Sequence, residues 1–223
     1  MARLGHTLGW RFLSVSHGVL EQPSKIALIT LNPAGSSIPP DHPWASCEEG
    51  SSYLVESWGG LDPGTSTLQV QVRCMFAALH RSLGMNGNSD DLLEQSLISH
   101  LIPFRSPRFA ELPHKKESVA FGQGLWRKLL PHVRPNLIIC LGRDAQRELK
   151  TLIPTALSAK HRDSNSYRTG WGDYTADIDT FAAAHGQVRL LFLPHLSTWT
   201  LFTSSKCSVD MPVIIEAAIE GVD

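Results

Sequence analysis

Four short apolar runs divide the chain, and each is bounded by proline, glycine or polar residues. The runs cover residues 26–31, 97–102, 137–141 and 188–193. Predominantly apolar runs of this length are typical of strands that are buried on both faces, as in a parallel sheet. The pattern therefore predicts a sheet of four parallel strands.

Segments with helical periodicity lie between these runs. Apolar residues recur three and four positions apart over residues 68–83, and the pattern stops at Gly84. Ser118 is suited to cap a second helix, and a third helix is expected after Gly142. A last helix is predicted over residues 211–219.

Alternation of strands and helices indicates an α/β fold in three α/β/α layers, with helices on both faces of the sheet. The length of 223 residues and the hydrophobic content of 42% suit a single domain over residues 1–223. Residues 41–64 and 158–179 lack a regular pattern and are expected to be long irregular segments. Segments of this kind in a compact domain are more often functional than accidental.

The charge balance bears on possible partners. A net charge of −1 excludes the strongly basic composition that by itself indicates nucleic-acid binding. Two local basic clusters are present all the same, and they either contact phosphates or lie in solvated loops. The clusters comprise Arg105, Arg108, Lys115 and Lys116 in one segment and Arg162 and Arg168 in another.

The four cysteines are far apart and form no C-x-x-C pair, which argues against a zinc or iron–sulfur site built from closely spaced ligands. No metal or other cofactor is expected. The chain has neither the apolar core of a signal peptide nor an apolar run of about 18 residues. These features predict a cytoplasmic protein without a membrane-spanning segment, and we expect a monomer.

The first apolar run ends abruptly at Asn32 and Pro33, and small residues follow. Open α/β sheets bind their ligands at the carboxyl ends of the strands. A carboxamide held there by a rigid proline is a candidate site residue, although an ordinary strand-ending turn explains it equally well.

The last apolar run ends in a similar way, because His195 and Ser197 follow Pro194. A histidine at a strand end is most often structural. Two polar strand ends that open onto one crevice favour a binding site instead, and His100 adds a third polar strand end.

These strand ends resemble motifs of the uracil-DNA glycosylase superfamily, over roughly residues 26–199. The mismatch-specific uracil and thymine glycosylases carry a Gly-aliphatic-Asn-Pro-Gly segment, which is similar to the first run and its turn, I-A-L-I-T-L-N-P-A-G-S. The family's H-P-S-P-L-S loop is similar to L-P-H-L-S-T-W, and L-I-I-C-L-G-R-D-A resembles the core strand that precedes a helix. Each motif is short, so their common order and spacing carry the resemblance.

The resemblance implies the glycosylase fold and a monofunctional DNA glycosylase, which hydrolyses an N-glycosidic bond and leaves an abasic site. It implies that Asn32 positions the attacking water and that His195 donates a hydrogen bond to the departing base. No metal is required. The implied partner is DNA, from which the target nucleotide is extruded before the reaction.

The resemblance also implies contacts to the extruded base and to the duplex. Trp44 is spaced from Asn32 like the family's aromatic residue that stacks on the base, although packing under the long loop also explains it. Trp199 stands at the place of the intercalating residue, with Leu201 as an alternative wedge and an aromatic side chain at the core edge as the simpler explanation. The candidates for phosphate contacts are Ser36, Arg105 and Ser197.

Two departures from the family bear on the substrate. His100 stands where many members carry an asparagine that pairs with uracil, and Ala34 stands where the uracil-specific branch has a tyrosine that excludes thymine. A neutral imidazole offers one donor and one acceptor, unlike a carboxamide, while alanine leaves room beside C5. We therefore expect a pyrimidine enlarged at C5, such as the hydroxymethylated or glucosylated cytosine of some phages. Residues 48–60 and 161–173 are candidate walls of a sugar-sized recess.

Three alternatives stay open from the sequence. The first is a repair glycosylase for uracil or mismatched thymine, and the second is a DNA-binding module without catalysis. The third is a different Rossmann-like hydrolase, although the usual glycine-rich nucleotide motifs and the nucleophile-elbow motif are absent.

Overall fold

The computed structural model describes residues 5–37 and 45–222 of the chain. The strands in these ranges are β1 (Ile26–Thr30), β2 (Leu97–His100), β3 (Leu137–Leu141), β4 (Lys160–Arg168), β5 (Thr175–Ala183) and β6 (Gly186–Leu193). The α-helices are α1 (Ser52–Val55), α2 (Thr67–Ser82), α3 (Ser89–Gln95), α4 (Lys115–Val133), α5 (Arg143–Leu157) and α6 (Asp210–Ile219). Short 3₁₀ helices are η2 (His17–Leu20), η3 (Phe109–Glu111) and η4 (Ser205–Cys207).

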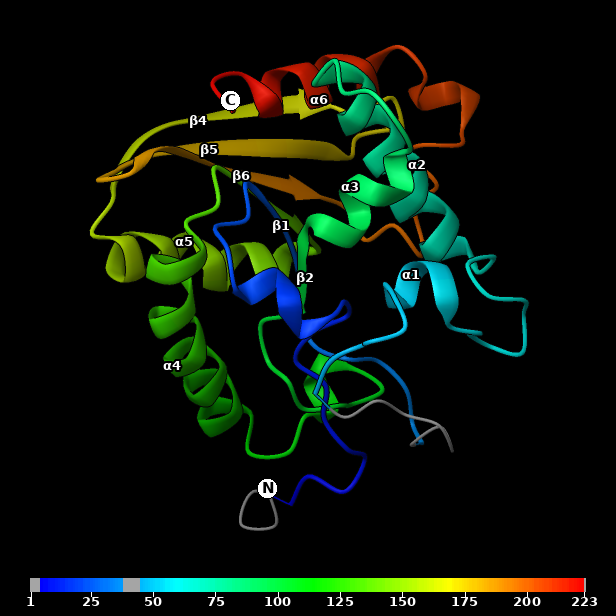
Figure 1. Cartoon of the computed structure of the whole chain (residues 1–223), viewed down its shortest axis with the longest axis vertical. Helices are drawn as coiled ribbons and strands as arrows, with labels where there is room; N and C mark the ends of the chain where they lie inside the picture. Colours follow the sequence, from blue (N-terminus) through cyan, green and yellow to red (C-terminus); the bar gives the residue numbers. More distant parts are fainter. Residues whose placement is uncertain (1–4, 38–44, 223) are drawn as a thin grey trace.

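The strands form one sheet of six strands in the order β2-β1-β3-β6-β5-β4 (Figure 1). The four strands predicted from the apolar runs are present, and each neighbouring pair among them is parallel. β5 runs antiparallel to β6, and β4 runs antiparallel to β5. The predicted α/β class is confirmed. The prediction of a sheet of only four parallel strands is wrong, because the sheet has six strands and two of the neighbouring pairs are antiparallel.

The two additional strands come from a region that was expected to be largely irregular, residues 158–179. The prediction failed there because β4 is an exposed edge strand with polar side chains along its length, so no apolar run marks it. The other segment expected to be irregular contains the short helix α1 in its described part, residues 45–64.

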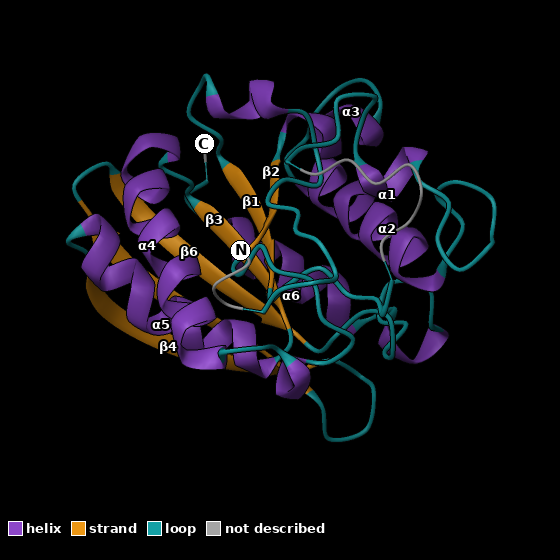
Figure 2. Ribbon diagram, turned by 90° about the horizontal axis from the view of Figure 1, so that it is seen from below, coloured by secondary structure: helices purple, strands orange, loops and turns teal. Residues whose placement is uncertain are grey.

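Alternate residues of the central strands enter two separate cores. In β1, Ile26 and Leu28 pack towards α2, α3 and α6, while Ala27 and Ile29 pack towards α4 and α5. All residues of β1 are buried, as expected for a strand covered on both faces. Figure 2 shows the helices divided between the two sides of the sheet, which gives the predicted α/β/α layers. Within the described ranges, no helix combines the length and apolar character needed to cross a membrane.

The helices begin and end close to the predicted positions, with one exception. Ser66 caps α2 in a reciprocal capping box with Gln69. Ser118 was expected to cap a helix, but α4 begins earlier and has His114 at its cap position. The Ser118 hydroxyl is buried inside α4, where it donates to the carbonyl oxygen of Pro113 at 2.9 Å and contacts Nε2 of His6 at 3.0 Å. It therefore fastens the N-terminal segment to the helix.

Helix α4 approaches the end of β2 so closely that only glycine fits at position 122. A Cβ atom there would lie 2.2 Å from the carbonyl oxygen of Leu101. We expect Gly122→Ala to lower the free energy of unfolding by about 1–3 kcal/mol, since the helix must move away from the sheet. Gly124→Ala is the matched control, because its Cβ would meet no atom within 4 Å. Urea unfolding of both variants measures the difference, and equal stabilities would contradict this account of the helix contact.

Candidate functional site

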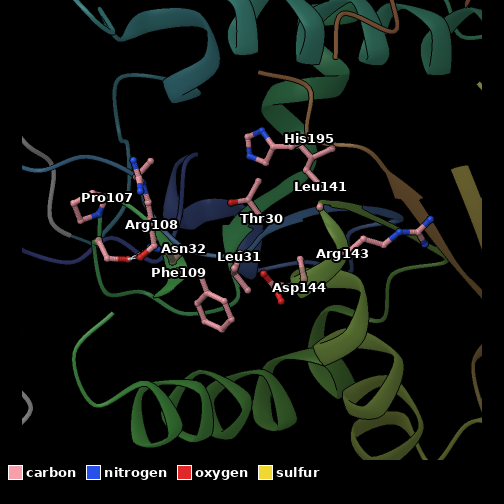
Figure 3. Close-up of a pocket in the computed structure, with 14 residues that line it drawn as sticks. Thr30, Leu31, Asn32, Pro107, Arg108, Phe109, Leu141, Arg143, Asp144 and His195 are labelled. Carbon is pink, nitrogen blue, oxygen red and sulfur yellow. Dashed lines mark hydrogen bonds between the residues drawn. The ribbon is translucent and has the colours of Figure 1, made fainter. Parts of the chain in front are cut away.

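A cavity of about 230 Å³ lies at the carboxyl ends of β1, β3 and β6 (Figure 3). This is the edge of a parallel sheet at which α/β proteins bind ligands. The walls come from the segments that follow these strands and from the loop after β2. The lining residues are Thr30, Leu31, Asn32, Ala34, Ser106, Pro107, Arg108, Phe109, Leu141, Gly142, Arg143, Asp144, Ala145 and His195. Asn32 and Ala34, from the turn after β1, are thus brought to one cavity with the distant His195.

The carboxamide of Asn32 is held by three acceptors. Its Nδ2 donates to the carbonyl oxygens of Pro33 at 3.1 Å and Phe104 at 3.3 Å, and to Oγ of Ser106 at 2.9 Å. Carbonyl oxygens accept hydrogen bonds only, so the nitrogen must occupy this side of the amide. The Oδ1 atom accepts no hydrogen bond from the described residues. Asn32 therefore lines the cavity with a fixed carboxamide, whose oxygen is its acceptor.

The turn that follows Asn32 is fixed by Arg105. The Nη1 group of Arg105 donates to the carbonyl oxygen of Ala34, and Gly35 adopts φ +113°, a conformation that favours glycine. A Cβ atom on Gly35 would lie 2.9 Å from Nη1 of Arg105. The half-buried Arg105, which the sequence suggested as a phosphate contact, thus has a structural role in holding this turn.

His195 enters the cavity as a hydrogen-bond donor. Its Nδ1 accepts from the backbone N–H of Ser197 at 3.3 Å and lies 2.8 Å from the Ser197 hydroxyl. Because a backbone N–H can only donate, Nδ1 carries no proton, and in the neutral ring the proton is on Nε2. Desolvation by the surrounding protein lowers the pKa of His195, although the residue as a whole is exposed. The ring is therefore neutral at pH 7 and offers an Nε2–H donor.

This assignment predicts the titration of His195. The folded-state pKa lies below the ordinary 6.5 of the unfolded chain, so the stability contributed by the neutral ring is complete above pH 6.5. It is lost as the pH falls through the lowered folded pKa. An NMR titration of the ring nitrogens should show the Nε2–H tautomer and a midpoint below 6.5. A midpoint above 6.5, or an Nδ1–H tautomer, would contradict the assignment.

Phe109 is a lining residue that the sequence did not single out. It begins η3, and its half-buried ring is one of the side chains drawn at the cavity in Figure 3. The Lys115 ammonium lies 3.8 Å from the centre of this ring, so a cation–π contact supports it. The neighbouring Arg108 also lines the cavity and is exposed, with its Nε 3.5 Å from Glu111. The sequence signal that could have indicated Phe109 is the presence of an aromatic residue in the basic, proline-rich segment after β2.

Arg143 links the cavity to the antiparallel part of the sheet. It follows Gly142 at the start of α5 and lines the cavity. Its Nη1 donates to Asp177, and its Nη2 donates to Oγ1 of Thr175 at 3.2 Å. The first residues of β5 are therefore fastened to the rim of the cavity.

His100 was expected at the base, but it is not among the described residues that line the cavity. Its Nδ1 lies 2.6 Å from the hydroxyl of Thr30, and its Nε2 lies 3.3 Å from that of Ser14. The residue is buried because the segment before β1 covers β2, with the His100 N–H donating to the carbonyl oxygen of Phe12 at 3.0 Å. His100 supports Thr30, a lining residue, from behind. The imidazole of His100 contacts Thr30 and Ser14, so it does not bear on which base the cavity accepts.

The remaining candidates within the described residues lie outside the cavity lining. Ser36 is exposed beyond the Asn32 turn, and Ser197 is exposed beside His195. Trp199 is half-buried, whereas Leu201 is buried and so is wrong as an exposed wedge. Trp44 lies outside the described residues.

The two long segments expected to wall a recess are not brought to this cavity. Residues 48–60 and 161–173 contribute nothing to the described lining of the cavity. Within the described ranges, no group of three or more His, Cys, Asp or Glu side chains is placed to hold a metal ion. No protein-family model matches the chain, and no curated protein matches it in sequence.

Proposed function

We propose that this protein hydrolyses the N-glycosidic bond of a pyrimidine nucleotide that has been turned out of DNA. The observation that carries the proposal is the carboxamide of Asn32. Its nitrogen donates to three acceptors, so Oδ1 is the atom with which Asn32 can accept a hydrogen bond at the cavity that His195 also lines. This pair supplies an acceptor for a water molecule and a donor for a departing base. The family resemblance of the strand ends points to the same reaction.

In this reaction the bond between C1′ of the sugar and N1 of the base breaks, and its electron pair leaves with the base. A water molecule donates a hydrogen bond to Oδ1 of Asn32 and attacks C1′, while Nε2–H of His195 donates to the base oxygen that gains negative charge. Water supplies the new C1′ hydroxyl, and its other proton passes to solvent and ultimately to the base. Since a carboxamide is no base at neutral pH, Asn32 acts by orientation.

The size of the cavity supports a single base as the occupant. Its volume of about 230 Å³ is below the range of roughly 300–1,000 Å³ found for drug-sized ligands. Phe109 offers an aromatic face on which the base can stack, a role that the sequence had suggested for Trp44. A base inside a duplex cannot reach such a cavity, so the nucleotide must be extruded.

Ala34 is the lining residue that bears on which base the cavity accepts. It is exposed at the cavity and presents only a methyl group. We infer that the site accepts a pyrimidine with a substituent at C5, such as a hydroxymethyl group. The inference of a C5 substituent depends on Ala34 alone, because His100 is not among the lining residues.

A panel of oligonucleotides tests the substrate. We expect base release from DNA with hydroxymethylated or glucosylated cytosine to be at least ten times faster than from uracil DNA. Ala34→Tyr should abolish release of the C5-substituted bases and spare uracil, because the ring occupies the space beside C5. Preferential release of uracil by the native protein would contradict the C5 proposal and favour a repair glycosylase. Binding without any abasic product would favour a DNA-binding module.

A further inference from the structure

Three aromatic side chains gather at the edge of the sheet that carries the cavity. The ring centre of Trp199 lies 4.0 Å from that of Tyr174 and 5.9 Å from that of Trp171. We call Trp171, Tyr174 and Trp199 the aromatic cluster. Trp171 and Trp199 are half-buried, whereas Tyr174 keeps 44% of its surface exposed. The cluster therefore offers an exposed aromatic side chain that two indole rings support.

The turn that carries Trp171 and Tyr174, residues 169–174, is held rigidly. The buried Thr169 hydroxyl donates to the carbonyl oxygen of Tyr174 at 2.8 Å and accepts from the Trp171 N–H at 3.3 Å. Gly170 adopts φ +80°, and a Cβ atom there would lie 2.3 Å from the carbonyl oxygen of Lys206. A ring on such a fixed turn loses little conformational freedom when another ring stacks on it.

The aromatic cluster is joined to the cavity from two directions. The Trp199 N–H donates to the carbonyl oxygen of His195 at 3.1 Å. Arg143 lines the cavity and donates to Thr175, the residue after Tyr174, at 3.2 Å. A nucleotide strand with one base in the cavity therefore has the cluster as a near neighbour.

A cation lies beside the cluster. The exposed Lys206 ammonium is 5.4 Å from the centre of the Trp171 ring. Proteins that bind single-stranded nucleic acid combine aromatic side chains that stack on bases with nearby positive charges for the backbone. Tyr174 and Lys206 provide this combination.

We propose that the aromatic cluster is a second base-binding site, which stacks on an unpaired base of the DNA strand next to the nucleotide in the cavity. This inference rests on the proposed function for the identity of the strand. Tyr174 stacks on the base, Trp199 and Trp171 support the tyrosine ring, and Lys206 contacts the adjoining phosphate. Since every base has an aromatic face, the site accepts any base.

Binding of a short single-stranded oligothymidylate, which carries no modified base, tests the inference. We expect oligothymidylate to quench the tryptophan fluorescence of the native protein, and we expect Tyr174→Ala to lose this quenching and to bind about tenfold more weakly in fluorescence anisotropy. Tyr174→Phe should bind like the native protein, since the ring is retained. Phe121→Ala is the matched control, because Phe121 is a similarly exposed aromatic residue on α4, at 47% exposure.

The outcomes separate this inference from the proposed function. Native affinity in Tyr174→Ala, equal losses in Tyr174→Ala and Phe121→Ala, or absence of oligothymidylate binding by the native protein would overturn the stacking site. A selective loss in Tyr174→Ala supports the site even if the native protein releases no base, in which case only the glycosylase proposal fails.

Discussion

Asn32→Ala is expected to reduce the single-turnover rate of base release about 100-fold or more, while DNA binding is retained. The substitution removes Oδ1, the acceptor that holds the attacking water at the cavity. Misplacement of a reacting group by about 1 Å is enough for an effect of this size. The rate is measured as abasic sites formed with enzyme in excess over DNA.

Ser106→Ala is the matched control for Asn32→Ala. It removes one of the three acceptors of the Asn32 amide and keeps the two backbone carbonyl oxygens in place. We expect a loss of about tenfold or less, because the carboxamide stays in position. If Asn32→Ala releases base at the native rate, the assignment of Asn32 as the water-positioning residue is wrong.

His195→Ala is expected to lower the same rate about 100- to 1,000-fold, the usual effect of removing one donor that stabilises a developing negative charge. His195→Gln should recover part of this loss, since the glutamine amide can also donate. The rate of the native protein should be constant from pH 8 to pH 6.5, because the pKa of His195 is lowered and the ring stays neutral in this window.

The pH profile distinguishes a neutral donor from a protonated one. If the native rate rises as the pH falls through 6.5 and this rise disappears in His195→Gln, the active ring is an imidazolium. That result would contradict the neutral Nε2–H donor inferred from the Ser197 N–H contact.

The central sheet could be predicted from the sequence because its strands are buried on both faces. Residues such as Leu28 and Ile139 lie in short, mainly apolar runs bounded by Pro, Gly or polar residues, and this length and these flanks favour a buried strand over a helix. Strand β4 could not be predicted in this way. It is an exposed edge strand, and its polar residues look the same in a strand and in a loop.

The site was partly predictable for a related reason. Asn32 and His195 are polar residues directly after buried strands, and parallel strands bring such positions to one edge of the sheet. His100 satisfies the same rule but is covered by the segment that carries Ser14. That segment pairs with β2 through long-range contacts, which a local pattern does not reveal. Phe109 was missed because it lies in a loop rather than at a strand end.

Free base and strand integrity, both measured in one single-turnover reaction, test whether this protein is a hydrolase with Asn32 at its site. We expect the native protein to release a free base and to leave the DNA strand intact with an abasic site. Asn32→Ala should form this product far more slowly under the same conditions. Absence of released base from every C5-modified and unmodified pyrimidine, or release at the native rate by Asn32→Ala, would contradict hydrolysis by a water molecule held at Asn32.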